Sequence, residues 1–415
     1  MTLAAVLTLG AATGGRAQDL SGFVSPGGGF PLPSVPEDWN WADLPFKLTA
    51  SQTVSYNSNV SSFPVGVAPV GTPVGDFTTT TNVGFSTKAN VENQQLFLDA
   101  TFGVVRYLHN VQFDTTIYSI NGGVDWNVTS RCSGTLTASL SKSPAQLNEQ
   151  VGTGVNFVTT NAFNETGKCG ISDGYSLLFN TGLTDLTNSN VQDAFNNSRT
   201  ALIAAGVEYE KGASTVTALA SLSDQTFTSR NALNSPGLAT QDTFHSFTLE
   251  YARQINPNLT VNGTIGLVGI TNDFTLALPK TLLPIYAVGA RWTVAPKLTL
   301  NVNAAKSIAP PTTIIANAQE SYNVSVGLVY QMTPKLSLTA LGSADYSTGQ
   351  FTGETLGATP FLIGAQRTYS LSAGLIYSMT PFLTAGLNAQ YFERVVENSI
   401  TPQDVITVSL NYRPY

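Results

Sequence analysis

The stretch from Ser321 to Tyr346 alternates between apolar and polar residues, and this alternation limits the possible fold more than any other feature of the chain. Its first half places Tyr, Val and Leu at every second position, with Ser, Asn and Gly between them. A Met-Thr-Pro-Lys segment interrupts the pattern, which then resumes up to Tyr346. A period of two is the signature of a strand with one apolar face. The stretch therefore predicts an antiparallel hairpin with an aromatic residue at each end of its apolar band, as in transmembrane β-barrels.

The same turn recurs along the second half of the chain. Copies begin at Asn256, Ala295, Thr333 and Thr380, each with Pro in second and Leu in fourth place, at intervals of roughly 40 residues. Proline suits such a turn because it fixes φ and donates no ladder hydrogen bond. A water-soluble propeller repeats at a similar period. Here, however, short turns alternate with long irregular connections, which favours the barrel.

Composition agrees with a barrel and excludes several other classes. Only 11% of the residues are charged, while 42% are hydrophobic. A soluble domain carries about 25% charged residues, and helical membrane proteins have continuous apolar runs, which this chain lacks after its start. The net charge of -7 argues against a nucleic-acid partner.

We expect three segments: a signal peptide at residues 1–17, a periplasmic Gly/Pro-rich linker at residues 18–45, and a barrel at residues 46–415. The first segment has a short apolar core followed by small residues, although no basic residue precedes Leu3. An ordinary buried strand is the alternative for this segment. Trp39 and Trp41 in the linker suit the membrane interface or contact with a partner.

The barrel segment predicts eighteen strands, an even number that lets a bacterial barrel close and leave no edge in lipid. Sixteen strands remain possible if the weakly alternating segments 156–170 and 214–226 are loops. The expected strands are residues 46–56, 76–90, 95–107, 115–128, 132–142, 156–170, 174–186, 199–210, 214–226, 242–254, 259–271, 284–294, 298–308, 319–331, 336–347, 367–378, 383–394 and 403–413.

Charges on the predicted lipid-facing side lie at or beyond the strand ends, as the cost of burying a charge in lipid requires. They are Lys142, Arg253, Lys306, Arg367 and Glu393. The predicted lumen face is mostly Ser, Thr, Asn, Gln and Gly. Its charged members, and our candidate pore residues, are Lys47, Lys88, Asp99, Asp125, Glu208, Glu250, Arg291 and Asp345, with Arg413 near the C-terminus.

Two interpretations of this lumen stay open. One is a hydrated neutral wall with scattered ion pairs. The other is a weakly cation-preferring constriction made by Asp99, Asp125 and Glu250, since acidic groups slightly outnumber basic ones. A basic ladder of the kind found in anion pores is absent. Eighteen strands enclose an aqueous channel unless the outer loops occlude it.

Cys132 and Cys169 are predicted at the periplasmic ends of neighbouring strands, in the same alternation phase. Because neighbouring strands bring Cα atoms within bonding range and the periplasm is oxidising, we expect a disulfide, with two unpaired thiols as the alternative. His109 and His245 lie at predicted outer strand ends without a nucleophile motif. We expect no catalytic residue, no metal site and no cofactor.

The chain resembles the putative β-barrel porin 2 family from about Phe46 to Tyr415. The resemblance rests on residues 54–60 (VSYNSNV), Arg106-Tyr107 with Asp114, residues 122–126 (GGVDW) and the Thr-Pro-Lys-Leu turns. Asn57 stands where the family more often has Asp, and Pro414 puts the terminal aromatic Tyr415 out of phase with the last strand. The resemblance implies an outer-membrane barrel associated with passage of polar solutes or polysaccharide.

The sequence thus predicts a non-enzymatic channel in the bacterial outer membrane, either a porin-like pore or the barrel component of exopolysaccharide export. The alternative is a structural or adhesive barrel closed by its loops. Expected partners are outer-membrane lipid and lipopolysaccharide, the barrel-assembly machinery and, for the export role, polysaccharide-export components.

Overall fold

The computed structural model describes residues 46–413, except residues 61, 67–73, 146–155, 192, 231–238, 273–281, 310–317, 351–364 and 397–398. The predicted signal peptide and linker, with Trp39 and Trp41, lie outside the described residues. Within these residues the chain is all β apart from two 3-10 turns, η2 (Val111–Phe113) and η4 (Ala194–Asn196).

Eighteen strands form, as predicted. They are β1 (Phe46–Asn57), β2 (Asp76–Val91), β3 (Gln94–Tyr107), β4 (Thr115–Thr129), β5 (Cys132–Pro144), β6 (Phe157–Ser172), β7 (Tyr175–Asn188), β8 (Ser198–Lys211), β9 (Ser214–Phe227), β10 (Gln241–Asn256), β11 (Leu259–Asn272), β12 (Leu283–Ala295), β13 (Leu298–Ala309), β14 (Ala318–Thr333), β15 (Leu336–Gln350), β16 (Gln366–Thr380), β17 (Leu383–Val396) and β18 (Ser399–Tyr412). The sixteen-strand alternative is wrong, because both doubtful segments form strands, β6 and β9.

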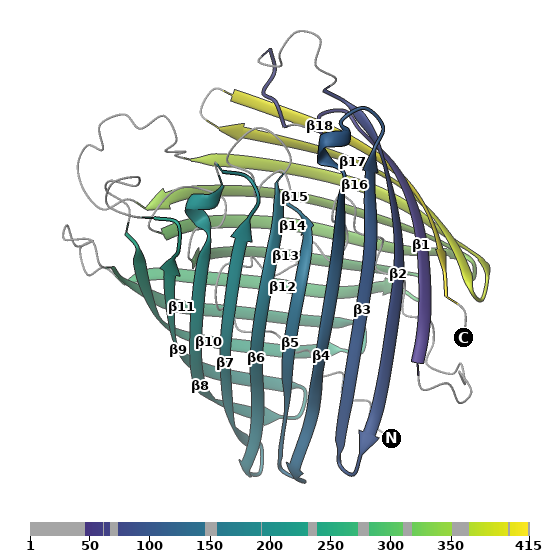
Figure 1. Cartoon of the computed structure of the whole chain (residues 1–415). Helices are drawn as coiled ribbons and strands as arrows, with labels where there is room; N and C mark the ends of the chain where they lie inside the picture. The colour runs from purple at the N-terminus through teal and green to yellow at the C-terminus, as the bar shows by residue number, and fades with distance from the viewer. Residues whose placement is uncertain are drawn as a thin grey trace.

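Each strand pairs antiparallel with its neighbours in the chain, and β1 pairs with β18 to close the sheet. The predicted up-and-down barrel is therefore confirmed. In Figure 1 the near wall, β2–β8, runs crosswise to the far wall, β12–β18. This crossing follows from the tilt that closure requires of every strand. Closure leaves no strand edge exposed to lipid.

The two faces of the sheet follow the alternation of the sequence. In β16, Tyr369 and Leu371 are exposed on the outer surface, whereas Thr368 and Ser372 on the other face are buried. Ladder partners extend each face around the barrel, since Thr368 pairs with both Asp345 and Arg394. Every position in the described strands can thus be assigned to the lipid-facing or the inward side.

The short turns form because the residue before the bend caps it. Thr333 Oγ1 accepts hydrogen bonds from the backbone N–H groups of Lys335 and Leu336. Asn256 Oδ1 accepts one from the N–H of Asn258 in the first Pro turn. The side chain of this residue supplies the acceptor that an Asx or Ser/Thr turn requires. The predicted x-Pro-x-Leu punctuation is therefore a turn motif with its own hydrogen bonds.

Aromatic side chains mark both borders of the lipid-facing band. On the periplasmic side, ring pairs form between Phe46 and Phe85 and between Tyr175 and Tyr209. On the outer side, Tyr56 pairs with Phe77 and Tyr322 with Tyr346. Ring pairs that join neighbouring strands at these levels support the sheet where it meets the headgroups.

Among the described residues, no helix is long and apolar enough to span a membrane.

Candidate functional site: the barrel lumen

Most of the predicted lumen charges lie in the periplasmic part of the barrel, in the inward alternation phase. Lys47, Lys88, Asp99 and Arg291 are exposed there, while Asp125, Glu208 and Glu250 are partly buried. Asp125 accepts a hydrogen bond from Thr135 Oγ1 on the next strand, at 2.7 Å. Arg413, just beyond β18, is at the same end of the barrel. The periplasmic half of the lumen therefore has a charged, hydrated lining.

Lys168 belongs to this lining, although sequence reasoning missed it. Its Nζ forms ion pairs with Glu208 and with Glu210, the latter at 3.4 Å, and so reaches from β6 across β7 to β8. The signal was present, because Asn164, Thr166 and Lys168 share the inward phase of β6. The weak alternation of that segment concealed it.

Glu250 interacts electrostatically with Glu208, since Thr217 of β9 lies between them in the same ladder row. Asp99 and Asp125 lie on neighbouring strands, and their ladder partners are Asn121 and Gln95. Glu250 is on β10, seven strands away from β3 in the sheet order. Asp99, Asp125 and Glu250 thus do not meet in one cluster. With Lys168, Glu210 and Arg413 included, five basic and five acidic side chains of the described residues line the periplasmic half, so the predicted acidic excess is absent there.

The outer half of the lumen differs, because its inward side chains are packed rather than hydrated. On β17, Gln390 and Arg394 keep only 6% and 5% of their surface exposed, and Gln403 on β18 keeps 6%. Thr53 on β1 and Gln366 on β16 are equally buried. Long polar side chains on the wall of an open aqueous channel would be wet. The outer half is therefore closed along β16–β18 and β1.

Asp345 is the one predicted pore charge in this outer half. Its carboxylate accepts a hydrogen bond from Asn323 Nδ2 at 2.6 Å. It shares a ladder row with Thr368 and Arg394. Asp345 therefore belongs to the packed region and not to the hydrated lining.

Two outer connections are joined by a network of amide side chains. Asn156, before β6, donates to Asn188 Oδ1 and accepts from the backbone N–H groups of Ser189 and Asn190. Asn197 Oδ1 accepts from the N–H of Asn188, which ties the two ends of the β7–β8 connection together. Asn156 has no exposed surface. The network makes the β5–β6 and β7–β8 connections one packed unit.

Arg230 joins the β9–β10 connection to this unit. Its guanidinium donates to Phe195 O at 2.8 Å, to Ala239 O at 3.2 Å and to Asn196 Oδ1 at 3.1 Å, and it lies over the ring of Phe227. Arg230 is 5% exposed and Asn196 only 1%. A planar donor fork can hold several carbonyl groups at once, which an ammonium group does less well.

Asp193, beside η4, links this loop unit to the opposite wall. Its carboxylate interacts electrostatically with Arg394 on the inner face of β17. In the sheet order β17 lies about half the circumference away from β7 and β8. Since Asp193 is 1% exposed, the β7–β8 connection extends inward across the mouth of the barrel. The loops and β17 together form the seal, which we define as Asp193, Asn196, Arg230 and Arg394.

An uncharged pocket opens on the inner wall of β13–β17. Its lining combines the polar side chains of Asn301, Ser325, Thr339, Ser372 and Asn388 with Gly327 and with apolar residues that include Val329 and Leu341. A side chain at position 327 would have space, since its nearest neighbour is 3.6 Å from the Cβ position. The pocket offers amide and hydroxyl groups without a formal charge.

The two histidines lie at the outer rim and on the lipid-facing side, and not in the lumen. His109 Nδ1 lies 3.1 Å from Asp76 Oδ1, and Asp76 also accepts from the backbone N–H groups of His109 and Asn110. The carboxylate thus holds the start of β2 against the segment that follows β3, at the outer rim of the barrel. His245 is on the lipid-facing side of β10. In the described part of the chain, no group of three or more His, Cys, Asp or Glu side chains could hold a metal ion.

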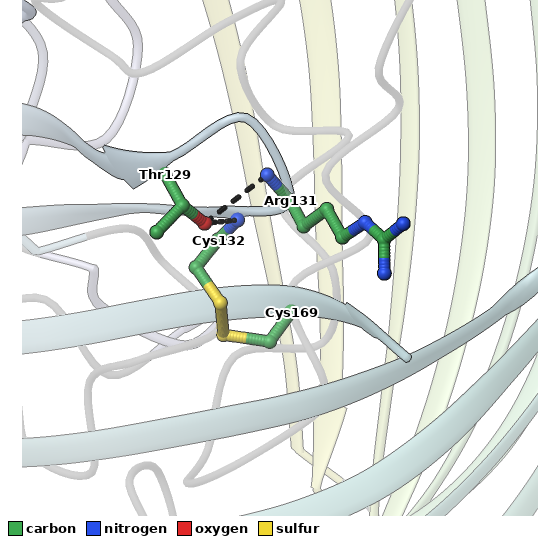
Figure 2. Close-up of a disulfide and its surroundings, with 4 residues drawn as sticks. All are labelled: Thr129, Arg131, Cys132 and Cys169. Atoms are coloured by element: carbon green, nitrogen blue, oxygen red, sulfur yellow. Dashed lines mark hydrogen bonds between the residues drawn. A yellow bond between two sulfur atoms is a disulfide. The ribbon is translucent and has the colours of Figure 1, made fainter. Parts of the chain in front are cut away.

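Cys132 and Cys169 are directly opposite each other in the ladder, and the structure joins them in a disulfide (Figure 2). Their Cα atoms are 4.1 Å apart. Thr129 Oγ1 accepts from the N–H groups of Arg131 and Cys132 and holds the turn beside the bond. The disulfide is at the periplasmic end, on the outward face, and it crosslinks β5 and β6.

Residues 283–413 match the family model described as Putative beta-barrel porin 2. The resemblance predicted from the sequence is confirmed over this region, which comprises β12–β18 and contains the Thr-Pro-Lys-Leu turn at Thr333. A closed barrel with this family match points to the bacterial outer membrane. A search of curated proteins found no significant match.

Among solved structures, the chain is similar to OpdL of Pseudomonas aeruginosa, with 10% identity, coverage of 89% of this chain and 98% of that one, and a TM-score of 0.48. It is also similar to the outer membrane protein OpdK of Pseudomonas aeruginosa, with 11% identity, coverage of 89% and 99%, and a TM-score of 0.47. The siderophore receptor PirA of Pseudomonas aeruginosa has 13% identity, coverage of 89% and 80%, and a TM-score of 0.46.

Proposed function

We propose that this chain is a gated outer-membrane channel for polar solutes, and that the described conformation is its closed state. The observation that carries the proposal is the division of the lumen. The periplasmic half has a balanced, hydrated lining, and the outer half is sealed by loops held at Arg394. A purely structural barrel has no need of a hydrated half-channel, because a packed interior is more stable.

The seal is suited to opening because it is polar. Its contacts among the described residues include hydrogen bonds of Arg230 and the electrostatic link between Asp193 and Arg394, and water can replace these when the loops move outward. An apolar plug would lose far more free energy on exposure to water. Opening therefore costs little per contact, which favours a gate over a permanent plug.

The solute class that the lining supports best is neutral and rich in hydroxyl groups. The periplasmic charges balance, so the lumen favours neither cations nor anions strongly. The pocket between Asn301 and Asn388 offers hydrogen-bond donors and acceptors without a charge. Saccharides match these groups. Polysaccharide export is the narrower form of this proposal, and the family resemblance supports it.

Conductance in planar bilayers tests the gate. We expect the wild-type protein to be mostly closed, with rare openings. Asp193→Ala and Arg394→Leu each remove one side of the link across the mouth and should raise the open probability at least several-fold. The charge exchange Asp193→Arg with Arg394→Asp should restore closure. Silence of the wild type and of every variant, with circular dichroism showing folded β-structure, would favour the structural or adhesive barrel instead.

The solute class has its own test. A neutral oligosaccharide should produce blocking events in the current of the Asp193→Ala channel. These events should become rarer in Asn301→Leu and Asn388→Leu, which remove amide groups from the pocket. Equal blocking by an anionic oligosaccharide would contradict the preference for neutral solutes while leaving the gate intact.

A further inference from the structure

The lipid-facing surface of β10–β18 is apolar between its two aromatic rows. The lipid-facing surface of the other strands can be compared with it. Its outward residues at that depth are Val, Leu, Ile, Ala and Gly with aromatics. Many are strongly exposed, such as Val326 at 48% and Leu371 at 62%. This half of the barrel therefore meets lipid.

A first polar patch interrupts the apolar band on β6 and β7. Glu165, Asn161 and Thr181 are in the outward phase, as shown by their ladder rows with Leu136, Leu140 and Glu165. Glu165 is nine residues into the sixteen of β6. It lies two ladder rows from the aromatic pair Trp126 and Phe179 at the periplasmic border. It is thus the exception to the expectation that outward charges lie only at strand ends.

The carboxylate of Glu165 has no hydrogen bond or ion pair with any other residue that the structure describes, and the same is true of the Asn161 amide. A carboxylate in the hydrocarbon layer is costly unless it is paired. Since no described residue of the same barrel pairs with it, a partner on another molecule would remove this cost.

A second polar patch lies on β1 and β2. Gln52 and Thr81 are directly opposite in the ladder and both are exposed on the outward face, with Thr79 two residues away. Thr81 Oγ1 donates to Gln52 Oε1 at 2.6 Å. This bond uses the acceptor of the Gln52 amide, and its two N–H donors have no partner among the described residues. Gln52 lies between the aromatic border residues Phe46 and Tyr56 of the same strand.

The two patches complement each other. One provides carboxylate acceptors and the other the amide donors of Gln52, and both lie inside the lipid-facing band. They are five strands apart in an eighteen-strand barrel, so they face different directions. A two-fold dimer would pair each patch with itself and bring two Glu165 carboxylates together. A head-to-tail contact pairs unlike patches and closes into a ring.

We propose that the barrel forms a closed ring of identical copies, in which Glu165 and Asn161 of one protomer contact Gln52 and Thr81 of the next. A hydrogen bond from the Gln52 amide to the Glu165 carboxylate is charge-assisted, and such bonds are stronger than neutral ones. The apolar faces of β10–β18 remain outside the ring, in contact with lipid.

Cysteine crosslinking in native membranes tests the contact. The full-length double variant Gln52→Cys with Glu165→Cys should form intermolecular disulfides that give a ladder ending at the size of the ring. The matched control, Leu249→Cys with Val326→Cys, has cysteines four strands apart on the apolar face and should stay monomeric. Crosslinking of Glu165→Cys alone, or no ladder from the double variant while it folds normally, would overturn the proposal.

Mass measurement in mild detergent gives an independent readout. Wild-type protein should be oligomeric, whereas Glu165→Leu should be monomeric, since it removes the acceptors and is compatible with lipid. The Glu165→Leu barrel should remain folded, as judged by its heat-dependent mobility in gels. A wild-type protein that is monomeric both in detergent and in membranes would contradict the ring.

Discussion

The rings of Trp126 and Phe179 stack at 6.1 Å between centroids, although two whole strands separate β4 from β7. Trp126, Gly134, Gly167 and Phe179 are successive ladder partners across β4, β5, β6 and β7. The two glycines have no side chains between the rings. The Trp126 ring therefore packs over Gly134 of β5, the Phe179 ring packs over Gly167 of β6, and the two rings contact each other. Aromatic cover of glycine is a known means of stabilising sheets.

This arrangement makes Gly134 intolerant of a side chain. A Cβ at this position would collide with the Thr166 carbonyl oxygen and the Trp126 ring. Gly134→Ala should therefore destabilise the barrel by about 1 to 3 kcal/mol, the usual cost of overpacking. Denaturant unfolding in lipid vesicles measures the loss. The control is Gly263→Ala on the outward face of β11, where the nearest atom is 3.8 Å away. Equal stability of the two variants would refute the packing argument.

The ion pairs of Lys168 set the charge of the periplasmic lining. Lys168→Met should leave Glu208 and Glu210 uncompensated and make the open channel cation-selective. The reversal potential of the Asp193→Ala channel in a salt gradient reports the change. Lys211→Met, at the exposed end of β8, removes a positive charge outside the lining and should leave selectivity unchanged. A shift of similar size in both variants would point to a general surface-charge effect.

Arg230 organises the outer loops rather than the barrel. Arg230→Ala should free the β7–β8 and β9–β10 connections to protease attack, while the barrel's unfolding free energy changes little, because the strands keep their ladder. Limited proteolysis on intact cells or vesicles measures the loop exposure. Arg199→Ala, which removes an exposed ion pair with Asp185, serves as the control and should leave the loops protected. Arg230→Ala loops that stay resistant would show that the seal does not depend on this side chain.

The disulfide crosslinks neighbouring strands whose cysteines are 37 residues apart. Restriction of the unfolded chain by a loop of this length stabilises the folded state by about 3 to 4 kcal/mol. Cys132→Ser with Cys169→Ser should show this loss in unfolding experiments under oxidising conditions. In reducing buffer the wild type and the double variant should become equal. A difference that persists after reduction would assign the effect to packing and not to the bond.

The strands could be predicted because lipid and water impose a strict period of two. Seventeen of the predicted starts lie within two residues of those in the structure; β18 is the exception, beginning at Ser399 and not at 403. Pro402 suggested a break, yet the strand includes it, and it pairs with Glu393 near the outer rim.

The seal could not be predicted. Asp193 is in the β7–β8 connection and Arg394 is in β17, about half the chain away. No periodic pattern links the two positions. Loop geometry depends on particular hydrogen bonds, such as those of Asn156 and Arg230, which alternation does not encode. Glu165 was visible in the sequence, but its outward direction depended on the register of β6, one of the two weakly alternating segments.

The meeting of β1 and β18 has a consequence for how the barrel is made. The ladder between them runs only from Ala50 to Asn57 on β1. Beyond it the β1–β2 connection continues the pairing, since the N–H groups of Ser58 and Val65 donate to the carbonyls of Asp404 and Ile400. These contacts join the first and last elements of the chain, so they carry the largest loop-closure entropy and should form late in folding. The outer end of β18 therefore finds its backbone partners in the β1–β2 connection and not in β1 itself.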